Sequence, residues 1–384
     1  MNEPITITGR HYVSGEAVSI VVHEGLIASV EPSEAQPETL PWLAPGLVDL
    51  QINGCFGLDF NTLPLAAETV VQATRLLFEQ GVTTYLPTVI TNSPDAIAEA
   101  MKSIASACEQ DALTNSAVAG IHLEGPFISP EDGARGAHAK AYVKAPDWQL
   151  FERWQEASGG RIKLITLSPE WPEACAFIER CSGTGVIVSI GHTVASPEQI
   201  DAAVRAGARL STHLGNGAQL MLPRHPNFLW EQLAQDELWS CFIADGFHLP
   251  DSFLKVGLRA KAGKALLVSD AVSLAGMAPG EYDLHIGGKV LLSPEGRLCV
   301  AENPKLLAGS AQLLPWGIAH LARKGLCTLA EAWEMSSLIP ASLLDLPAAA
   351  GLAKGAPADL ALYDWDGNEL RIARAYKNGA LVKG

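Results

Sequence analysis

Both ends of the chain show short runs in which apolar and polar positions alternate, the pattern of strands with one buried face. Residues 5–8, 17–22 and 26–30 form such runs near the start, separated by glycines, and residues 360–363 continue the pattern near the end. We expect the two ends to pair. They predict a small β-sandwich module built from residues 1–45 and 346–384.

Between the two ends, short and almost wholly apolar runs alternate with longer stretches of helical spacing. Continuous apolar runs are typical of strands that are buried on both faces of a parallel sheet. Eight such runs occur, at residues 46–53, 83–90, 117–125, 161–168, 185–192, 210–216, 240–245 and 265–270. The stretches between them include residues 65–80, 93–110, 196–206 and 251–262.

Eight strand-helix units predict an α/β fold, a (β/α)8 TIM-type barrel that occupies residues 46–345. Ser93-Pro94 and Ser196-Pro197 have the residue types of an N-cap followed by the first helical position. An open doubly wound sheet is the alternative architecture. However, no Gly-x-Gly-x-x-Gly follows the first strand, so the sequence does not favour a dinucleotide site.

The composition leaves the predicted fold unchanged but excludes some classes of binding partner. The 384 residues are 48% apolar and 18% charged, which is typical of globular proteins and not of disordered chains. The 27 Lys and Arg against 42 Asp and Glu give a net charge of −15, which opposes binding to nucleic acid or to an anionic membrane. The sequence shows no signal peptide or apolar span, and its seven cysteines never occur as Cys-x-x-Cys. We therefore expect a cytoplasmic protein with reduced thiols.

Charged side chains follow the predicted strands, at the barrel edge where active sites of such barrels lie. Glu124 ends the third run, His192 ends the fifth, and His213 lies in the sixth. One carboxylate and two imidazoles are a proper ligand set for a catalytic Zn²⁺ with an open fourth position, and Asp270 would lie beside that position. Each histidine alone could be an ordinary core or loop residue. Their repetition on consecutive strand ends favours a metal site.

Three further features are more ambiguous. His138 lies in a glycine-rich loop after the third run, where it would either lean over the pocket or remain a solvated loop histidine. Arg224 follows the sixth run and offers a cation for an anionic ligand, or is an exposed loop arginine. Leu307, Ala308, Gly309 and Ser310 are expected to begin a helix whose N–H groups hold substrate oxygens, with a plain N-cap as the alternative.

Taken in chain order, these motifs resemble the N-acetylglucosamine-6-phosphate deacetylase family of the amidohydrolase superfamily, over essentially the whole chain. The motifs are Pro45-Gly-Leu-Val-Asp-Leu-Gln51-Ile-Asn53-Gly, His122-Leu-Glu124-Gly-Pro126, Gly191-His192-Thr, Thr212-His213-Leu-Gly-Asn216, Ala244-Asp-Gly-Phe-His248, Ser269-Asp270-Ala and Leu307-Ala-Gly-Ser310. Together they are highly specific, although each alone is not.

The resemblance implies a role for each matching residue. Glu124, His192 and His213 would be the metal ligands, Asp270 the catalytic acid and base, and His138 the group that polarises the carbonyl. The sugar- and phosphate-binding positions would be Ala137, Asn216, Gly217, Arg224, His248, Leu307, Ala308 and Gly309. Because the phosphate-binding arginine of related deacetylases comes from the neighbouring subunit, the resemblance also implies a homodimer in which Arg224 crosses the interface.

Two departures from the superfamily pattern matter. Gln51 and Asn53 stand where many amidohydrolases carry the His-x-His of a second metal, and they form a poorer ligand pair. We therefore expect one divalent ion per subunit, Zn²⁺ first, with Fe²⁺, Mn²⁺ or Co²⁺ as alternatives. The stretch after Asn216 also differs from several relatives, which leaves both gluco and galacto sugars, and the need for the 6-phosphate, open.

The implied reaction belongs to amino-sugar metabolism. It hydrolyses the N-acetyl group of N-acetylglucosamine 6-phosphate to glucosamine 6-phosphate and acetate, with metal-activated water as nucleophile and Asp270 as general base and then acid. The alternatives are a deacetylase of another N-acetylhexosamine or its phosphate, and a small cyclic-amide hydrolase without a phosphate clamp. A non-catalytic scaffold barrel is a third. The intact Glu124, His192, His213 and Asp270 argue against the scaffold.

Overall fold

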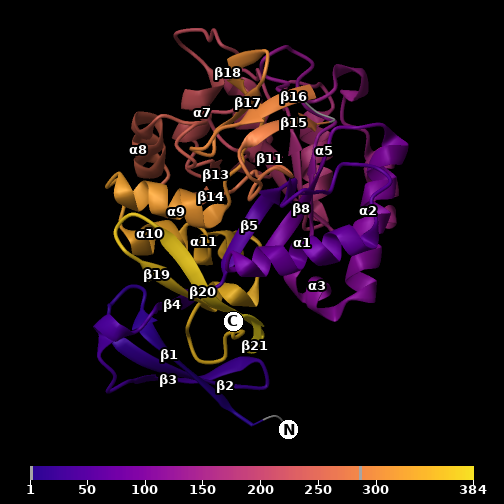
Figure 1. The fold of residues 1–384 in the computed structure, drawn as a ribbon. Coiled ribbons are helices and arrows are strands. Elements are labelled where there is room, and N and C mark those ends of the chain that lie inside the picture. The colour runs from indigo at the N-terminus through magenta and orange to yellow at the C-terminus, as the bar shows by residue number, and fades with distance from the viewer. Residues whose placement is uncertain (1–2, 285–287) are drawn as a thin grey trace.

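The computed structural model describes residues 3–284 and 288–384 and contains a helix-covered barrel with a separate β-sheet at one end (Figure 1). The first and the last described strands both lie in that sheet, below the barrel in the view of Figure 1. A smaller sheet lies at the opposite end of the barrel. Residues 1–2 and 285–287, which fall within the predicted module and the predicted barrel respectively, lie outside the described residues.

Eight parallel strands form the barrel in the order β14-β13-β12-β11-β10-β9-β8-β5. They are β5 (Leu47–Ile52), β8 (Val82–Ile90), β9 (Ile121–Glu124), β10 (Ile162–Leu167), β11 (Ile187–Ile190), β12 (Ala208–Ser211), β13 (Trp239–Phe242) and β14 (Ala265–Leu267). The ends of the sheet meet through a bridge between Ile52 and Ala271 and a 2.9 Å hydrogen bond from the Asp270 N–H to the Gln51 carbonyl. This closure confirms the TIM-type barrel, and the open doubly wound alternative is wrong.

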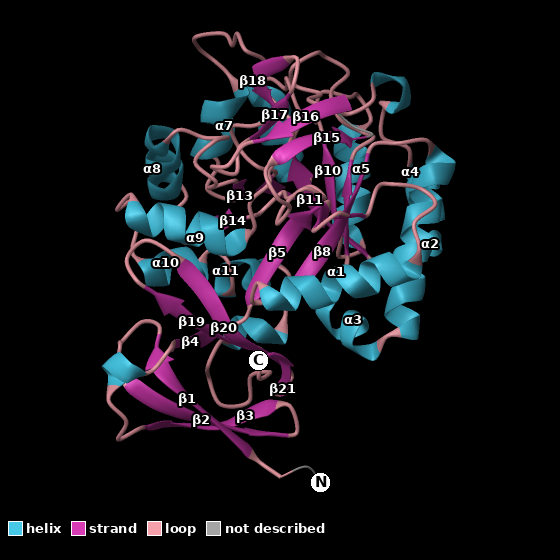
Figure 2. Cartoon of the chain, viewed as in Figure 1, coloured by secondary structure: helices cyan, strands magenta, loops and turns pink. Residues whose placement is uncertain are grey.

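Helices cover the outside of the barrel (Figure 2). They are α1 (Ala67–Glu79), α2 (Pro94–Gln110), α3 (Ala112–Ala117), α4 (Trp148–Ala157), α5 (Ala174–Gly183), α6 (Pro197–Arg205), α7 (Phe228–Ala234), α8 (Asp251–Ala260), α9 (Leu314–Arg323), α10 (Leu329–Glu334) and α11 (Leu338–Leu343). Short 3-10 turns occupy Pro37–Thr39, Lys140–Tyr142 and Pro347–Ala350. In the described ranges, no helix is both long and apolar enough to traverse a bilayer.

Local sequence explains where two of these helices begin. The Ser93 hydroxyl accepts a hydrogen bond from the Ala96 N–H, and Pro94 occupies the first turn of α2, where a missing N–H is harmless. Ser196 and Gln199 form a reciprocal capping box at the start of α6. Both predicted Ser-Pro starts are therefore confirmed.

The barrel interior changes from apolar to polar toward the carboxyl ends of the strands. Val48, Leu86 and Leu266 belong to an apolar cluster of strand side chains that fills the interior. The hydroxyl of Thr166 contacts both His122 Nε2 and the Thr212 hydroxyl at 2.7 Å. This polar contact chain places hydrogen-bonding groups in the same region as Glu124, which lies two residues after His122 on β9.

Strands from both chain ends form one seven-stranded sheet in the order β21-β20-β19-β4-β1-β2-β3. They are β1 (Ile5–His11), β2 (Ala17–His23), β3 (Leu26–Pro32), β4 (Trp42–Pro45), β19 (Leu360–Trp365), β20 (Leu370–Lys377) and β21 (Ala380–Lys383). Apolar residues of both halves, among them Ile20, Leu43 and Leu362, share one core. The predicted pairing of the two ends is confirmed, while the division of the chain at residues 45 and 346 stays a prediction.

A four-stranded antiparallel sheet at the mouth of the barrel was not predicted. It consists of β15 (Gly280–Leu284), β16 (Gly288–Leu292), β17 (Leu298–Val300) and β18 (Asn303–Leu307), and a two-stranded hairpin, β6 (Gly54–Cys55) with β7 (Leu58–Asp59), follows β5.

The prediction that Leu307, Ala308, Gly309 and Ser310 begin a helix is wrong. Leu307 ends β18, where it pairs with Cys299, and α9 begins only at Leu314. Strand pairing holds Leu307 extended, and Gly309 follows with a φ of +107°, which no helix adopts. Pro315 then supplies the fixed backbone angle that suits the first turn of a helix.

Candidate active site

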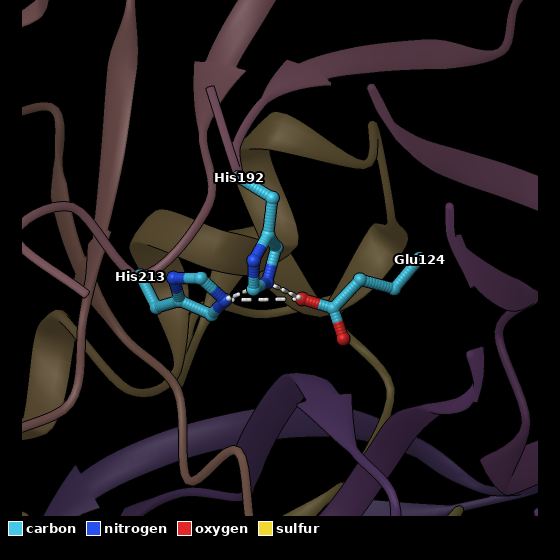
Figure 3. Close-up of side chains that lie close together, drawn as sticks. All are labelled: Glu124, His192 and His213. Atoms are coloured by element: carbon cyan, nitrogen blue, oxygen red, sulfur yellow. Dashed lines mark hydrogen bonds and ion pairs between the residues drawn. The ribbon is translucent and has the colours of Figure 1, made fainter. Parts of the chain in front are cut away.

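Glu124, His192 and His213 meet at the carboxyl ends of the barrel strands (Figure 3). Glu124 Oε1 lies 3.0 Å from His213 Nε2 and 3.3 Å from His192 Nε2, and the two Nε2 atoms are 3.1 Å apart. All three side chains are buried. Among the described residues, they form the one group of three or more His, Cys, Asp or Glu side chains close enough to hold a metal ion.

The hydrogen bond of His192 Nδ1 and the spacing of the three side chains fit a metal ion. His192 Nδ1 lies 2.9 Å from the Ala134 carbonyl, so Nδ1 carries the proton and the Nε2 lone pair points to the shared centre. Donor atoms around a tetrahedral zinc lie roughly 3.4 Å apart, since zinc–ligand bonds are about 2.0–2.2 Å, and the observed spacing is close to this value. Burial would raise the pKa of Glu124, but the neighbouring His192 and His213 side chains hold it well below its usual value.

The backbone adopts an uncommon conformation at this site. His192, His213 and Asp270 have φ angles of 49°, 27° and 45°, in the left-handed region that residues other than glycine rarely adopt. Each lies just after a barrel strand, where the chain turns out of the sheet. The turn directs these side chains into the site.

Gln51 and Asn53 direct their amide groups at acidic side chains. Gln51 Nε2 donates a 2.8 Å hydrogen bond to Glu124 Oε1, and Asn53 Nδ2 donates one of the same length to Asp270 Oδ1. Through their nitrogens the two residues act as hydrogen-bond donors to Glu124 and Asp270. Their amide oxygens, the atoms that could bind a metal, are buried and have no hydrogen-bond partner in the described structure.

Asp270 and His138 lie beside the Glu124 group with shifted pKa values. Burial raises the pKa of Asp270 to about 6, and the negative charge of Glu124 adds to this effect. Burial lowers the pKa of His138 to about 3, and His192 lowers it further. The His138 ring packs edge-on against that of His192 with 4.5 Å between centroids, so it is a neutral imidazole close to the three convergent side chains.

These side chains line a cavity of about 640 Å³, which is large enough for a sugar phosphate. Its lining includes all the predicted substrate-binding residues except Arg224, namely Ala137, Asn216, Gly217, His248, Leu307, Ala308 and Gly309. Arg224 lies exposed on the loop before α7 and does not line the cavity of its own chain. Lys305 on β18 is the one lysine or arginine among the described residues of the lining.

Sequence reasoning missed several residues around this cavity. Thr91 directly follows β8 and lies 2.8 Å from His138 Nδ1 through its hydroxyl oxygen. Asn61 lines the cavity and bonds to the backbone of β8 through both ends of its amide. Thr91 carried the same signal as the predicted residues, because it also follows a predicted strand. The location of Lys305 depends on the unpredicted sheet at the mouth.

Comparison with known proteins places this geometry in a family. Residues 42–382 match the model of the amidohydrolase family. The chain is 34% identical over 354 residues to N-acetylglucosamine-6-phosphate deacetylase of Rattus norvegicus, covering 88% of this chain and 83% of the relative. It is 32% identical over 324 residues to the N-acetylglucosamine-6-phosphate deacetylase of Lysinibacillus sphaericus, covering 84% of this chain and 81% of the relative.

A solved structure agrees with these relatives. It is an N-acetyl-D-glucosamine-6-phosphate deacetylase variant from Mycobacterium smegmatis in complex with N-acetyl-D-glucosamine-6-phosphate. It superposes with a TM-score of 0.85 and 25% identity over the full length of both chains. The chain is therefore a hydrolase of the amidohydrolase family, and the relatives it resembles within that family are N-acetylglucosamine-6-phosphate deacetylases.

Proposed function

We propose that this protein hydrolyses the N-acetyl group of N-acetylglucosamine 6-phosphate, which yields glucosamine 6-phosphate and acetate. The observation that carries the proposal is the convergence of buried Glu124, His192 and His213 in a cavity that Asp270 and His138 also line. The chain also matches relatives named N-acetylglucosamine-6-phosphate deacetylase over more than four fifths of its length.

Glu124, His192 and His213 would hold one divalent ion per subunit, with Zn²⁺ favoured over Fe²⁺, Mn²⁺ or Co²⁺. When bound, such an ion supplies Lewis acidity that lowers the pKa of water to about 7 and polarises the acetyl carbonyl. Support for a single ion comes from the donor set, because Glu124, His192 and His213 form the one metal-binding group among the described residues and the amides of Gln51 and Asn53 are poorer ligands than imidazoles.

Asp270 would move the proton in both halves of the reaction. With a pKa near 6 it is largely ionised at neutral pH, so it can accept the proton of the attacking water. The same carboxyl group then donates that proton to the departing nitrogen, which leaves as the free amine. His138 would donate a hydrogen bond to the acetyl oxygen as negative charge develops there, and such a donor typically contributes about 2.7–4 kcal/mol.

The remaining cavity residues would bind the sugar. The Nδ1 atom of His248 lies 2.7 Å from Asp245, which leaves its other ring nitrogen for a sugar hydroxyl. Ala137, Asn216 and Gly217 lie on loops next to the metal ligands, and Leu307, Ala308 and Gly309 face them from β18 and the turn after it.

The phosphate would be bound across a homodimer interface by Arg224 of the partner subunit. In support, Leu220 and Met221 on the loop that carries Arg224 are 93% and 86% exposed. The two adjacent side chains form a small exposed apolar patch at the edge of the cavity, which Leu220 also lines, and contiguous exposed apolar patches mark interaction surfaces. Sedimentation of the wild type and of Met221→Asp tests the proposed homodimer. We expect the wild type to be a dimer and the variant a monomer. A monomeric wild type would contradict the proposed homodimer.

We also propose a cytoplasmic location. All seven cysteines lie in the described part of the chain and none is paired. Unpaired thiols suit a reducing compartment.

Acetate release by the purified, zinc-loaded protein tests the activity. The substrates are N-acetylglucosamine 6-phosphate, its unphosphorylated form, N-acetylgalactosamine 6-phosphate and a cyclic amide such as dihydrouracil. We expect the highest kcat/KM for the first. Hydrolysis of the cyclic amide without acetate release from any sugar would contradict the proposal.

A further inference from the structure

The hydroxyl of Thr91 is a buried polar group that touches the site without facing the cavity. Its oxygen lies 2.8 Å from His138 Nδ1 and 3.4 Å from the backbone carbonyl of Glu124. Thr91 is 4% exposed and follows β8 directly. Because Ile90 pairs with Glu124 across β8 and β9, the strand register itself brings the hydroxyl to this position.

The neighbouring backbone leaves room for this hydroxyl. A Cβ atom at Gly125 would lie 2.1 Å from Thr91 Oγ1, and Gly125 has a φ of +84°, which a side chain disfavours. His138 has two other contacts. Its backbone carbonyl accepts a hydrogen bond from the Arg135 guanidinium, and the His138 ring packs edge-on against the His192 ring. Thr91 is therefore the hydrogen-bond partner of the His138 ring among the described residues.

A neutral imidazole carries its proton on one nitrogen only. If Nδ1 donated to Thr91, the hydroxyl would have to donate to the carbonyl at 3.4 Å, well beyond the ordinary O–H···O range of about 2.5–3.0 Å. If the hydroxyl donates to Nδ1 at 2.8 Å, the proton of the ring lies on Nε2. An imidazole nitrogen also accepts hydrogen bonds better than an alcohol oxygen does, which favours the second arrangement.

The second arrangement also suits the cavity. His138 lines it, and in the described structure its Nε2 has no hydrogen-bond partner. With the proton on Nε2, the ring offers a hydrogen-bond donor to a ligand oxygen in the cavity.

We propose that Thr91 is a positioning residue, whose hydroxyl donates to His138 Nδ1 and thereby holds the ring with Nε2–H directed at the substrate's acetyl oxygen. This inference rests on the proposed function, because the oxygen in question is that of the acetyl group. Thr91 itself contacts neither substrate nor metal. It acts through the orientation and proton position of His138.

Kinetics of two variants test the role of the hydroxyl. Thr91→Val keeps the shape and removes the donor, and we expect kcat to fall about 10- to 100-fold with KM and zinc content little changed. Thr91→Ser keeps the donor, and we expect it to retain most of the wild-type kcat. Wild-type kcat in the valine variant, or an equal loss in the serine variant, would overturn the proposal.

Nitrogen NMR of the zinc-loaded wild type tests the proton position without any substrate, so it remains decisive even if the deacetylase assignment fails. The His138 signals are identified by their loss in His138→Gln. We expect a protonated Nε2 and a hydrogen-bonded, unprotonated Nδ1, whose resonance moves toward that of a free imidazole nitrogen in Thr91→Val but not in Thr91→Ser. A proton on Nδ1 in the wild type would overturn the inference.

Discussion

Asn53 donates a 2.8 Å hydrogen bond from its side-chain amide to Oδ1 of Asp270. One oxygen of this partly buried carboxylate is therefore occupied, and the hydrogen bond fixes the orientation of the side chain. Under the proposed function this amide would hold the proton carrier in place.

The first prediction concerns Asp270 itself. Asn is nearly isosteric but cannot accept a proton, so Asp270→Asn should lower kcat at least about a hundredfold while substrate Kd changes little. Steady-state kinetics and equilibrium binding of N-acetylglucosamine 6-phosphate measure the two quantities. If the variant instead loses its metal and recovers activity in excess zinc, Asp270 is a ligand and not the proton carrier.

The second prediction is the metal content. Two imidazoles and one carboxylate, with amides at Gln51 and Asn53, should bind one divalent ion per chain. Elemental analysis of protein purified without added metal measures this ratio, and His192→Asn should lower it while an exchange at exposed His225 should not. Two tightly bound ions per subunit would contradict a single site.

The third prediction concerns phosphate recognition by Arg224. A charge-assisted hydrogen bond contributes roughly 1.5–3 kcal/mol, or about 10- to 150-fold. Arg224→Ala should raise KM by about this factor for the phosphorylated substrate and leave the unphosphorylated substrate unaffected. Arg259→Ala, an exposed arginine on α8, is the matched control. An equal loss for both substrates would indicate that Arg224 is structural.

The fourth prediction uses Asp49, a carboxyl group buried where the barrel closes. Its Oδ1 accepts N–H groups of Gln51 and Ser269, its Oδ2 has no partner in the described structure, and burial raises its pKa to about 7. Because the folded chain holds this proton up to about pH 7 while the unfolded chain loses it near pH 4, Asp49 makes stability fall as pH rises between those values.

Asp49→Asn keeps the Oδ1 acceptor and does not titrate. The free energy of unfolding, measured in urea at pH 5 and pH 8, should therefore decrease less with rising pH in the variant than in the wild type. Subtracting the variant's change in unfolding free energy from that of the wild type removes the pH dependence that both proteins share. A wild type that loses no more stability than the variant would show that Asp49 is already ionised at pH 5.

Sequence predicted the barrel and the metal group because both depend on strong local signals. Residues such as Val188 and Ile190 lie in continuous apolar runs, and Glu124 and His192 follow from the rule that strand ends carry the chemistry. The sheet at the mouth was missed because strand β18, Asn-Pro-Lys-Leu-Leu, is largely exposed and shows no alternation. The role of Thr91 could not be read from its neighbours, because its partner His138 lies 47 residues away.

The left-handed backbone at His192, His213 and Asp270 has a consequence for engineering. Each such residue strains the fold by about 1–3 kcal/mol, and glycine would relieve that strain while removing the reactive group. Libraries selected for heat resistance alone should therefore accumulate glycine or asparagine at these three positions and lose turnover. Thermostable variants of this enzyme are better sought by keeping these positions fixed and mutating the outer helices.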